Sequence, residues 1–349
     1  MTETFTDLPF DAAFAQAPAG SITRGRIRVG SFASGAEIAQ PFLIAKGAKP
    51  GPCLWICGQV HGNEINGIWG AIDFIAELDL AELSGSVVFA PTANPLALDA
   101  RSKAAPQDGL DLDQTFPGNM NGQITEQMSA AYFQAASAHA DVLISMHTMT
   151  HLFHSAPYAV YKLHPESGIG EERLFSLIRH FHPNVACRMN VAPGAGELPG
   201  NIPGAIDYQM LALGKPAFMV ELGAGSETNP DCVALAKRGL RGVAAEMGLL
   251  PPSEHAPAKT LRRVTRRTHV MTHEGGLFRT EVTPATLLHA GMPIGKISTL
   301  TGAPLSEPTM EQDVFMIGVR KDPVVHTGDR IAFVALEWDE VPAPDAPPA

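Results

Sequence analysis

Short apolar runs alternate with segments of helical periodicity between residues 50 and 250, and this alternation constrains the fold more than any other feature. Apolar runs typical of buried strands occupy residues 53–60, 87–91, 141–146 and 217–221. Apolar residues at helical spacing predict helices over residues 66–83, 126–139, 171–182, 206–213 and 231–247. Strands that alternate with helices indicate an α/β domain with a largely parallel sheet.

The segments outside this core have other patterns. Residues 21–45 alternate polar and apolar side chains around Ser34 and Gly35, which predicts a hairpin. Residues 94–125 are rich in Asn, Asp, Gly and Pro and are interpreted as a long loop, a kind of segment that is usually functional or disordered. We assign both segments to a main domain over residues 1–250.

The composition changes near Pro251. Residues 251–260 have the Pro-rich composition of a linker, and the short β-type runs that follow are broken by glycine. This pattern predicts a small all-β domain over residues 261–340. The Pro/Ala-rich residues 341–349 are predicted to be a flexible tail.

Composition limits the classes of partner. The chain has 349 residues, of which 45% are hydrophobic and 17% are charged, so a sizeable core can form. A formal net charge of −11 would repel nucleic acid and anionic membranes, and we expect a small-molecule substrate instead. The one dense basic run, Arg262, Arg263, Arg266 and Arg267, is interpreted as a solvated linker or an edge strand.

Cysteine usage and the N-terminal residues favour a reducing compartment. The chain has four cysteines, which are few for its length, and the CxxxC pair at Cys53 and Cys57 lies in an apolar run, so buried thiols are expected. Residues 1–20 lack the basic and apolar regions of a signal peptide, and no run of about 18 apolar residues is present. We therefore predict a cytoplasmic protein.

His61, His147 and Glu221 each stand at the end of a predicted strand. Because sites in open α/β sheets form at the carboxyl ends of the strands, we expect these side chains to share one site. His61 and Glu64 are three residues apart and can turn toward one zinc ion, with His147 as the third ligand and an open position for water. The HxxE spacing alone is common by chance, and the strand-end context is what favours a metal site.

Five short motifs occur in order along the chain. They are His61-Gly62-Asn63-Glu64, Ala93-Asn94-Pro95 followed by Arg101, the segment Asp111-Leu112-Asp113-Gln114-Thr115-Phe116-Pro117-Gly118, Met146-His147-Thr148, and Val220-Glu221-Leu222-Gly223. Together they resemble the HG[DN]E, ANP…R, DLNRxFPG, DLHT and VELG motifs of the succinylglutamate desuccinylase/aspartoacylase family. This resemblance covers most of residues 50–250, and the β-rich region after residue 260 is similar to the family's C-terminal β domain. It implies a zinc-carboxypeptidase-like mixed sheet flanked by helices.

The resemblance also implies a role for the matched residues. His61, Glu64 and His147 would bind one Zn²⁺ per chain, Glu221 would act as general base and then acid, and Arg101 would stabilise the oxyanion. The chemistry of these groups agrees with the roles, because zinc activates water and polarises carbonyls, a carboxylate can relay a proton, and a guanidinium stabilises developing negative charge. Asn94 of the second motif is assigned to substrate binding.

The third motif departs from the family pattern at Asp113 and Gln114, where relatives have an Asn-Arg pair that binds a substrate carboxylate. Without the bidentate guanidinium, we infer that the substrate lacks that carboxylate or carries a cation near Asp113, while Gln114 hydrogen-bonds a neutral group. The alternative is that another arginine, such as Arg188, binds the carboxylate. Ser145 is a second departure, because it replaces an Asp that could support the metal-binding imidazole two residues later.

His151 and Tyr158 follow the fourth motif and are assigned to the substrate pocket. Taken together, these residues predict a zinc-dependent hydrolase that cleaves the amide bond of a small N-acylated amine or amino-acid-like compound. The alternatives are a zinc exopeptidase that acts on short peptides and a non-catalytic metal-binding protein that kept the fold. Whether the protein forms a homo-oligomer stays open.

Overall fold

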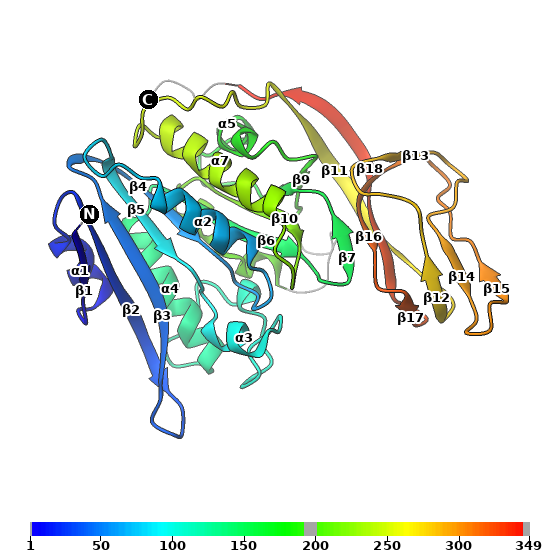
Figure 1. Ribbon diagram of the computed structural model, residues 1–349, viewed down its shortest axis with the longest axis horizontal. Helices are drawn as coiled ribbons and strands as arrows, with labels where there is room; N and C mark the ends of the chain where they lie inside the picture. Colours follow the sequence, from blue (N-terminus) through cyan, green and yellow to red (C-terminus); the bar gives the residue numbers. More distant parts are fainter. Residues whose placement is uncertain (1, 192–200, 345–349) are drawn as a thin grey trace.

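Helices cover both faces of a mixed β-sheet, as the sequence predicts (Figure 1). The computed structural model describes residues 2–191 and 201–344. Four neighbouring parallel strands form the centre of the sheet, in the order β5 (Ser84–Ala90), β4 (Lys49–Cys57), β6 (Val142–Met149) and β10 (Ala217–Ala224). Every residue of β6 is buried, which is expected of a parallel strand whose two faces are both covered.

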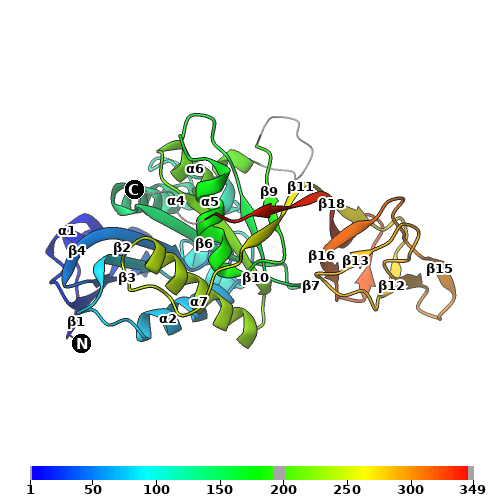
Figure 2. The ribbon, with the colours of Figure 1, turned by 90° about the horizontal axis from the view of Figure 1, so that it is seen from above.

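Alternate residues of β4 belong to two different cores. Leu54 and Ile56 pack with apolar side chains of α2, α5 and α7, whereas Trp55 packs with those of α1, α4 and α6. These helices are α1 (Phe10–Gln16), α2 (Asn66–Ala76), α4 (Ile124–His139), α5 (Glu171–Ile178), α6 (Ile206–Ala212) and α7 (Pro230–Glu246). Figure 2 shows α2 and α7 on one side of the sheet and α4 and α6 on the other. Among the described helices, none has the length and apolar character needed to cross a membrane.

The N-terminal strands extend the sheet beyond β5. The predicted hairpin is present as β2 (Ser21–Ser31) and β3 (Glu37–Lys46), which pair antiparallel along their whole length. β3 continues into the central sheet by pairing with β5, and β1 (Thr2–Phe5) pairs in parallel with β2. The sheet is therefore mixed, with parallel strands at its centre.

The residues after 260 are all β among those described, and their first strand joins the main sheet. β11 (Thr260–Met271) pairs in parallel with β9 (Ala186–Arg188) on one side and antiparallel with β18 (Arg330–Pro342) on the other. The sheet continues from β10 to β9 through β8 (Tyr158–Tyr161) and from β18 into β16 (Val314–Arg320), to which β7 (Phe153–Ser155) and β13 (Leu287–Leu288) also pair. A separate sheet contains β12 (Gly276–Arg279), β14 (Lys296–Ser298), β15 (Pro304–Ser306) and β17 (Val324–Val325). The domain boundary at 251–260 stays a prediction.

Several predicted boundaries differ from the structure. The long loop at 94–125 contains α3 (Pro95–Ala100) and the 3₁₀ turn η1 (Leu112–Gln114), because Asn94 and Asp111 each cap the turn that follows them. The helix predicted over 66–83 ends at Ala76, and the chain then turns through residues 79–82. Two further 3₁₀ turns are η2 (Arg179–Phe181) and η3 (Ile202–Gly204).

The first residues of the predicted C-terminal tail belong to the folded chain. Residues 341 and 342 belong to β18, and Ala343 is buried. The Ala343 backbone donates to Lys259 O over 2.9 Å and accepts from Arg179 Nη1 over 3.0 Å, so this part of the chain is fixed to the main domain. Residues 345–349 of the predicted tail lie outside the described residues.

The basic run is neither a linker nor a free edge, which corrects its interpretation from sequence. It lies in β11 between β9 and β18, where Arg262, Arg263 and Arg266 form ion pairs with Glu340, Asp339 and Glu337 of the neighbouring strand. Arg267 differs from these three because its side chain is buried, with 5% of its surface exposed. The pairing of β11 with β18 shifts register on both sides of Arg266, and Arg267 is buried just after this irregularity.

A buried ion pair connects the end of β8 to the start of α6. Lys162 Nζ lies 2.7 and 2.8 Å from the two carboxylate oxygens of Asp207, and both side chains are at most 1% exposed. A buried carboxylate that loses its cation retains an uncompensated charge in a region of low dielectric. We therefore treat the pair as a structural requirement of this corner of the fold.

Replacing Lys162 with Met is expected to lower the free energy of unfolding by about 3–5 kcal/mol, because Asp207 would stay buried without its partner. Urea unfolding followed by circular dichroism measures this change. The control is Lys237→Met, which breaks the more exposed pair with Glu77 and should cost about 1 kcal/mol or less. Equal losses in the two variants would contradict the assignment.

Candidate active site

The three predicted metal ligands meet at the carboxyl ends of β4 and β6. The ligand atoms of His61, Glu64 and His147 lie within 4.8 Å of one another, and all three side chains are buried. His61 and Glu64 lie on the turn between β4 and α2, whereas His147 lies within β6, which runs three residues further than predicted. A Cβ on Gly62 would lie 1.7 Å from the carbonyl oxygen of Ala97, so only glycine fits directly after His61.

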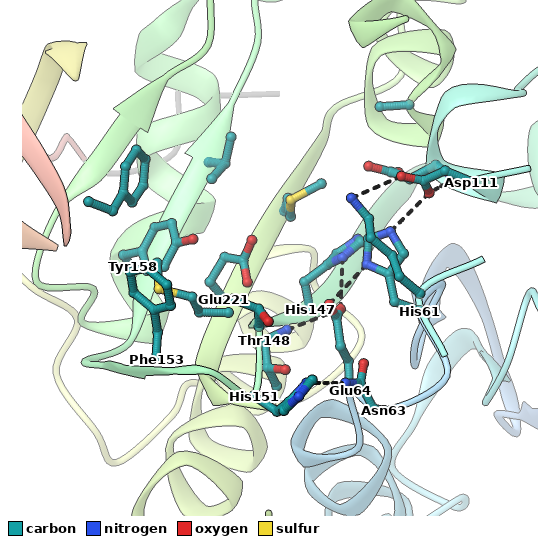
Figure 3. A pocket seen from close by; sticks show the side chains of 18 of the residues that line it. His61, Asn63, Glu64, Asp111, His147, Thr148, His151, Phe153, Tyr158 and Glu221 are labelled. Carbon is teal, nitrogen blue, oxygen red and sulfur yellow. Dashed lines mark hydrogen bonds and ion pairs between the residues drawn. The ribbon is translucent and has the colours of Figure 1, made fainter. Parts of the chain in front are cut away.

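Glu64 lies between the two imidazoles (Figure 3). Its Oε1 is 2.9 Å from His61 Nδ1, and its Oε2 is 3.0 Å from His147 Nδ1. The Nε2 atoms point away from this centre, that of His61 to Asp111 Oδ1 and that of His147 to Ser145 Oγ, both at 3.0 Å. Each ring is therefore held from behind while its Nδ1 faces the shared point.

Ser145 thus supplies the support whose loss the sequence suggested. Its hydroxyl is shorter than the Asp side chain of relatives, but it lies on the same strand as His147 and reaches the ring directly. Asp111 performs the matching role for His61 and was not assigned to the site from sequence. Its signal was its place at the start of the third motif, where Lys103 also pairs with it at 3.0 Å.

The charges of His61, Glu64 and His147 depend on one another. Burial opposes ionisation of Glu64, but the adjacent His61 and His147 outweigh it and lower the pKa of Glu64 to about 2. Burial also opposes protonation of the imidazoles, yet Glu64 and Asp111 raise the pKa of His61 well above its usual range, and Glu64 raises that of His147. Without a metal, the Glu64 carboxylate is balanced by protons on the rings.

This donor set fits a zinc ion. Two imidazole nitrogens and one carboxylate oxygen aimed at a single point are the protein ligands of many catalytic zinc sites, which leave one position for water or substrate. The buried negative charge of Glu64 favours a cation at that point, and the partners of the Nε2 atoms fix the ring orientations.

Glu221 lies on β10 directly beside this centre. Its backbone is in register with His147 on one side and with Tyr158 on the other. Burial raises the pKa of Glu221 to about 7, against the opposing effect of His147 and a hydrogen bond from Tyr158. Its Oε2 is buried and has no hydrogen-bond partner among the described residues. A buried carboxylate that titrates near neutral pH and faces a cavity is suited to proton transfer.

One pocket of about 590 Å³ joins the metal ligands and Glu221 to most of the other predicted site residues. Its lining includes Arg101, Asp113, Gln114, His151 and Tyr158. Asn94 is a correction, because it is fully buried outside the described lining and its side chain caps α3 by accepting from the backbone of Ala97. Asn94 therefore has a structural role in the second motif, as the N-cap residue of α3.

The predicted pocket residues differ in what their side chains already contact. The amide of Gln114 donates to Asp111 over 3.1 Å and accepts from the Asn201 backbone over 3.0 Å, so both of its ends are engaged. His151 lies on the rim, 3.3 Å from the Asn63 side chain. Arg101 adopts a left-handed conformation with φ of 53°, which is rare outside glycine and directs the chain after α3.

Asp113 is the pocket carboxylate with the fewest contacts. Its Oδ1 is buried and has no hydrogen-bond partner among the described residues. Burial raises the pKa of Asp113, although the nearby His147 and Lys162 oppose this effect. A carboxylate in this situation gains most from a cationic ligand.

The pocket also contains residues that no sequence motif identified. Lys162 comes from the end of β8, and Arg267, His269, Arg330 and Phe333 come from β11 and β18. Only the register of the C-terminal strands against β9 brings the last four to the pocket, and nothing local in the sequence encodes that register. Arg188, the alternative carboxylate ligand, is exposed at the end of β9 and is absent from the described lining.

Comparison with known proteins agrees with the motifs. The family profile of the succinylglutamate desuccinylase/aspartoacylase catalytic domain matches residues 50–247. The chain is 24% identical over 300 residues to N-alpha-acetyl-L-2,4-diaminobutyric acid deacetylase of Halomonas elongata, which covers 84% of this chain and 85% of the relative.

Solved structures share the fold over nearly the whole chain. A succinylglutamate desuccinylase/aspartoacylase of Rhodobacter sphaeroides has a TM-score of 0.79 and 22% identity, over 96% of this chain and 99% of that one. The product-bound ectoine utilization protein EutE of Ruegeria pomeroyi has a TM-score of 0.78 and 21% identity, over 92% and 98%. The predicted combination of an α/β sheet and a C-terminal β region is therefore the fold of these proteins.

His61→Ala is expected to abolish binding of about one Zn²⁺ per chain, since three protein ligands are needed for such a site. Ser145→Ala should weaken the affinity by about 10- to 100-fold, because the His147 ring would lose the partner that orients it. Metal content and competition with a chromophoric chelator measure both effects. His289→Ala, an exposed histidine of the C-terminal region, serves as the control. Full zinc binding by His61→Ala would rule out the site.

Proposed function

Because this chain belongs to the succinylglutamate desuccinylase/aspartoacylase family, we propose that it is a zinc-dependent hydrolase that cleaves the amide bond of a small N-acylated amine or amino-acid-like compound. The observation that carries this proposal is the shared pocket of the buried His61, Glu64 and His147 centre and the buried Glu221. A metal-binding protein without catalysis would have no need of an unsatisfied carboxylate beside the ligands.

The metal ligands supply the first part of the mechanism. When bound by His61, Glu64 and His147, Zn²⁺ would polarise an amide carbonyl and lower the pKa of a coordinated water toward about 7. Asp111 and Ser145 keep the two rings in the orientation that this binding needs. The three ligands leave room in the pocket for a substrate carbonyl.

Glu221 supplies the proton transfers. Its pKa near 7 allows it to accept a proton from the attacking water and to return that proton to the leaving amine nitrogen. The hydrogen bond with Tyr158 holds one side of the carboxylate, and the free Oε2 is the atom available to the water. Tyr158 is thereby proposed as a positioning residue for Glu221.

Arg101 supplies positive charge to the reacting carbonyl. Its guanidinium belongs to the pocket lining, and the strained backbone at this residue is consistent with a functional constraint. A cation at this position would stabilise the negative charge that develops on the amide oxygen during attack.

The buried Asp113 favours substrates with a second amine. Its unpartnered Oδ1 lies in the pocket where relatives have a neutral asparagine, and an ammonium group would satisfy it. The Halomonas relative is named for N-alpha-acetyl-L-2,4-diaminobutyric acid, whose second amino group is free and positively charged at neutral pH. We propose substrates of this class, in which one amine is acylated and another is not.

The two alternative functions, an exopeptidase and a non-catalytic metal-binding protein, have less support than the deacylase. The Asn-Arg pair that would bind a terminal carboxylate beside the scissile bond is replaced, and the replacement Gln114 is engaged by Asp111 and Asn201. A cytoplasmic location stays a prediction.

Glu221→Gln is expected to lower kcat by about 10²- to 10⁴-fold while zinc content is unchanged, because only the proton relay is lost. Release of free amine from N-acetyl-2,4-diaminobutyrate by zinc-loaded protein measures this change. Glu172→Gln, on the exposed side of α5, should retain full activity. Turnover by the Glu221→Gln protein at the normal rate would exclude the proposed mechanism.

Asp113→Asn is expected to lower kcat/KM for N-acetyl-2,4-diaminobutyrate by about 10-fold or more, since it removes the charge that pairs with the free ammonium. N-acetyl-2-aminobutyrate lacks that ammonium, so its hydrolysis should change little. The ratio of the two kcat/KM values is the measurement, and the exposed Asp73→Asn is the control. An unchanged ratio would show that Asp113 does not select the cation.

A further inference from the structure

The C-terminal strands contribute three basic side chains to the pocket. Arg267 and His269 come from β11, and Arg330 comes from the start of β18. Arg267 is nearly fully buried, although it belongs to a run whose other arginines lie in ion pairs at the surface. Its burial places the guanidinium at the boundary of the cavity.

Phe333 packs against two of these side chains, and the four residues are called the basic wall. The His269 ring stacks on it with centroids 4.5 Å apart and an angle of 23°, and the Arg267 guanidinium lies 5.5 Å from its centroid. The Tyr158 ring is 6.3 Å from Phe333 on the side toward Glu221. In Figure 3, Tyr158 lies on the other side of Glu221 from His61 and Asp111.

The C-terminal strands contribute basic side chains but no carboxylate to the described lining. The described lining contains four carboxylates, Glu64, Asp111, Asp113 and Glu221, and none of them comes from the C-terminal strands. Within the described part of the chain, the Arg330 side chain makes no hydrogen bond or ion pair, and His269 Nδ1 is buried without a hydrogen-bond partner. Burial lowers the pKa of His269 to about 4, and the charges of Arg330 and Arg267 contribute to this, which indicates a positive potential at the wall.

We propose that Arg330 and Arg267 form an anion-binding subsite that holds a carboxylate of the substrate. The proposal rests on the proposed function, because it assigns a further group of the same substrate. A guanidinium binds a carboxylate with two parallel hydrogen bonds, and partial exclusion of water strengthens that pair. The C-terminal region thereby selects substrate, in place of the arginine that the third motif lacks.

The carboxylate can belong to either half of the substrate. In an N-acylated amino acid it is part of the leaving amine, whereas in an N-succinyl amine it is part of the acyl group. Matched pairs of compounds separate these sources. N-acetyl-2,4-diaminobutyrate is compared with its primary amide, and N-succinyl-1,4-diaminobutane is compared with N-butyryl-1,4-diaminobutane.

Calorimetric titration of zinc-loaded Glu221→Gln protein with these four compounds tests the subsite without any need for turnover. The acid of one pair should bind more tightly than its neutral partner, and Arg330→Gln should reduce that preference by about 10- to 100-fold. Arg330 is exposed, so its loss should not disturb folding, and Arg267→Gln provides a second variant. Arg266→Gln is the matched control, since this arginine of β11 pairs with Glu337 and does not belong to the described lining.

Equal affinity of acid and neutral compound in both pairs, or a preference that survives in Arg330→Gln and Arg267→Gln, would overturn the subsite. Absence of binding by all four compounds would overturn it as well. Hydrolysis by the wild-type protein is measured separately with the same compounds. Arginine-dependent binding without hydrolysis would refute the proposed function and leave the subsite standing, whereas hydrolysis without acid preference would do the reverse.

Discussion

The site depends on one buried carboxylate, Glu64, held between two imidazoles at the ends of neighbouring parallel strands. Such a charge is stable in the protein interior only with a cation or with protonated partners, and the protein provides both rings and the second partners that orient them. This requirement explains the narrow turn at Gly62, where the approach of the Ala97 carbonyl leaves no space for a side chain. It also explains why β4 and β6 must be adjacent, since no local segment could bring His147 to the other two residues.

Much of this arrangement could be predicted from the sequence, because parallel strands and the helices between them leave a clear periodic signal. The position of His61 after β4 followed from that signal, and the motif order identified the family, whereas Glu221 lies inside β10 rather than at its end. The role of Asn94 could not be predicted in the same way, since a motif residue that caps a helix and one that binds substrate look alike in a sequence. The position of His147 inside β6 was missed because the strand continues as far as its partner β10 does, through Met149.

The C-terminal strands were the least predictable part of the site. Their β character was evident from glycine-broken apolar runs, but their register against β9 depends on long-range pairing that has no local signature. Arg266 and Arg267 show the consequence. They are adjacent in the sequence and chemically identical, yet one forms a surface ion pair with Glu337 and the other is buried against the pocket. The shift in strand register at Arg266, which depends on long-range pairing, separates the two environments.

The continuity of the sheet from β10 through β8 and β9 to β11 connects catalysis to recognition. Glu221 and Tyr158 are paired residues of β10 and β8, and the Tyr158 ring in turn approaches Phe333 of β18. A substrate that reaches from the metal ligands to the basic wall would therefore contact a single hydrogen-bonded sheet, whose strands cannot shift independently. Because Glu221, Arg267 and Arg330 belong to strands of the same sheet, their separation limits the length of the substrate as well as its charge. A molecule with a cationic group near Asp113 and an anionic group near Arg330 would satisfy both at once, whereas a neutral amide of the same length would leave both charges facing the cavity.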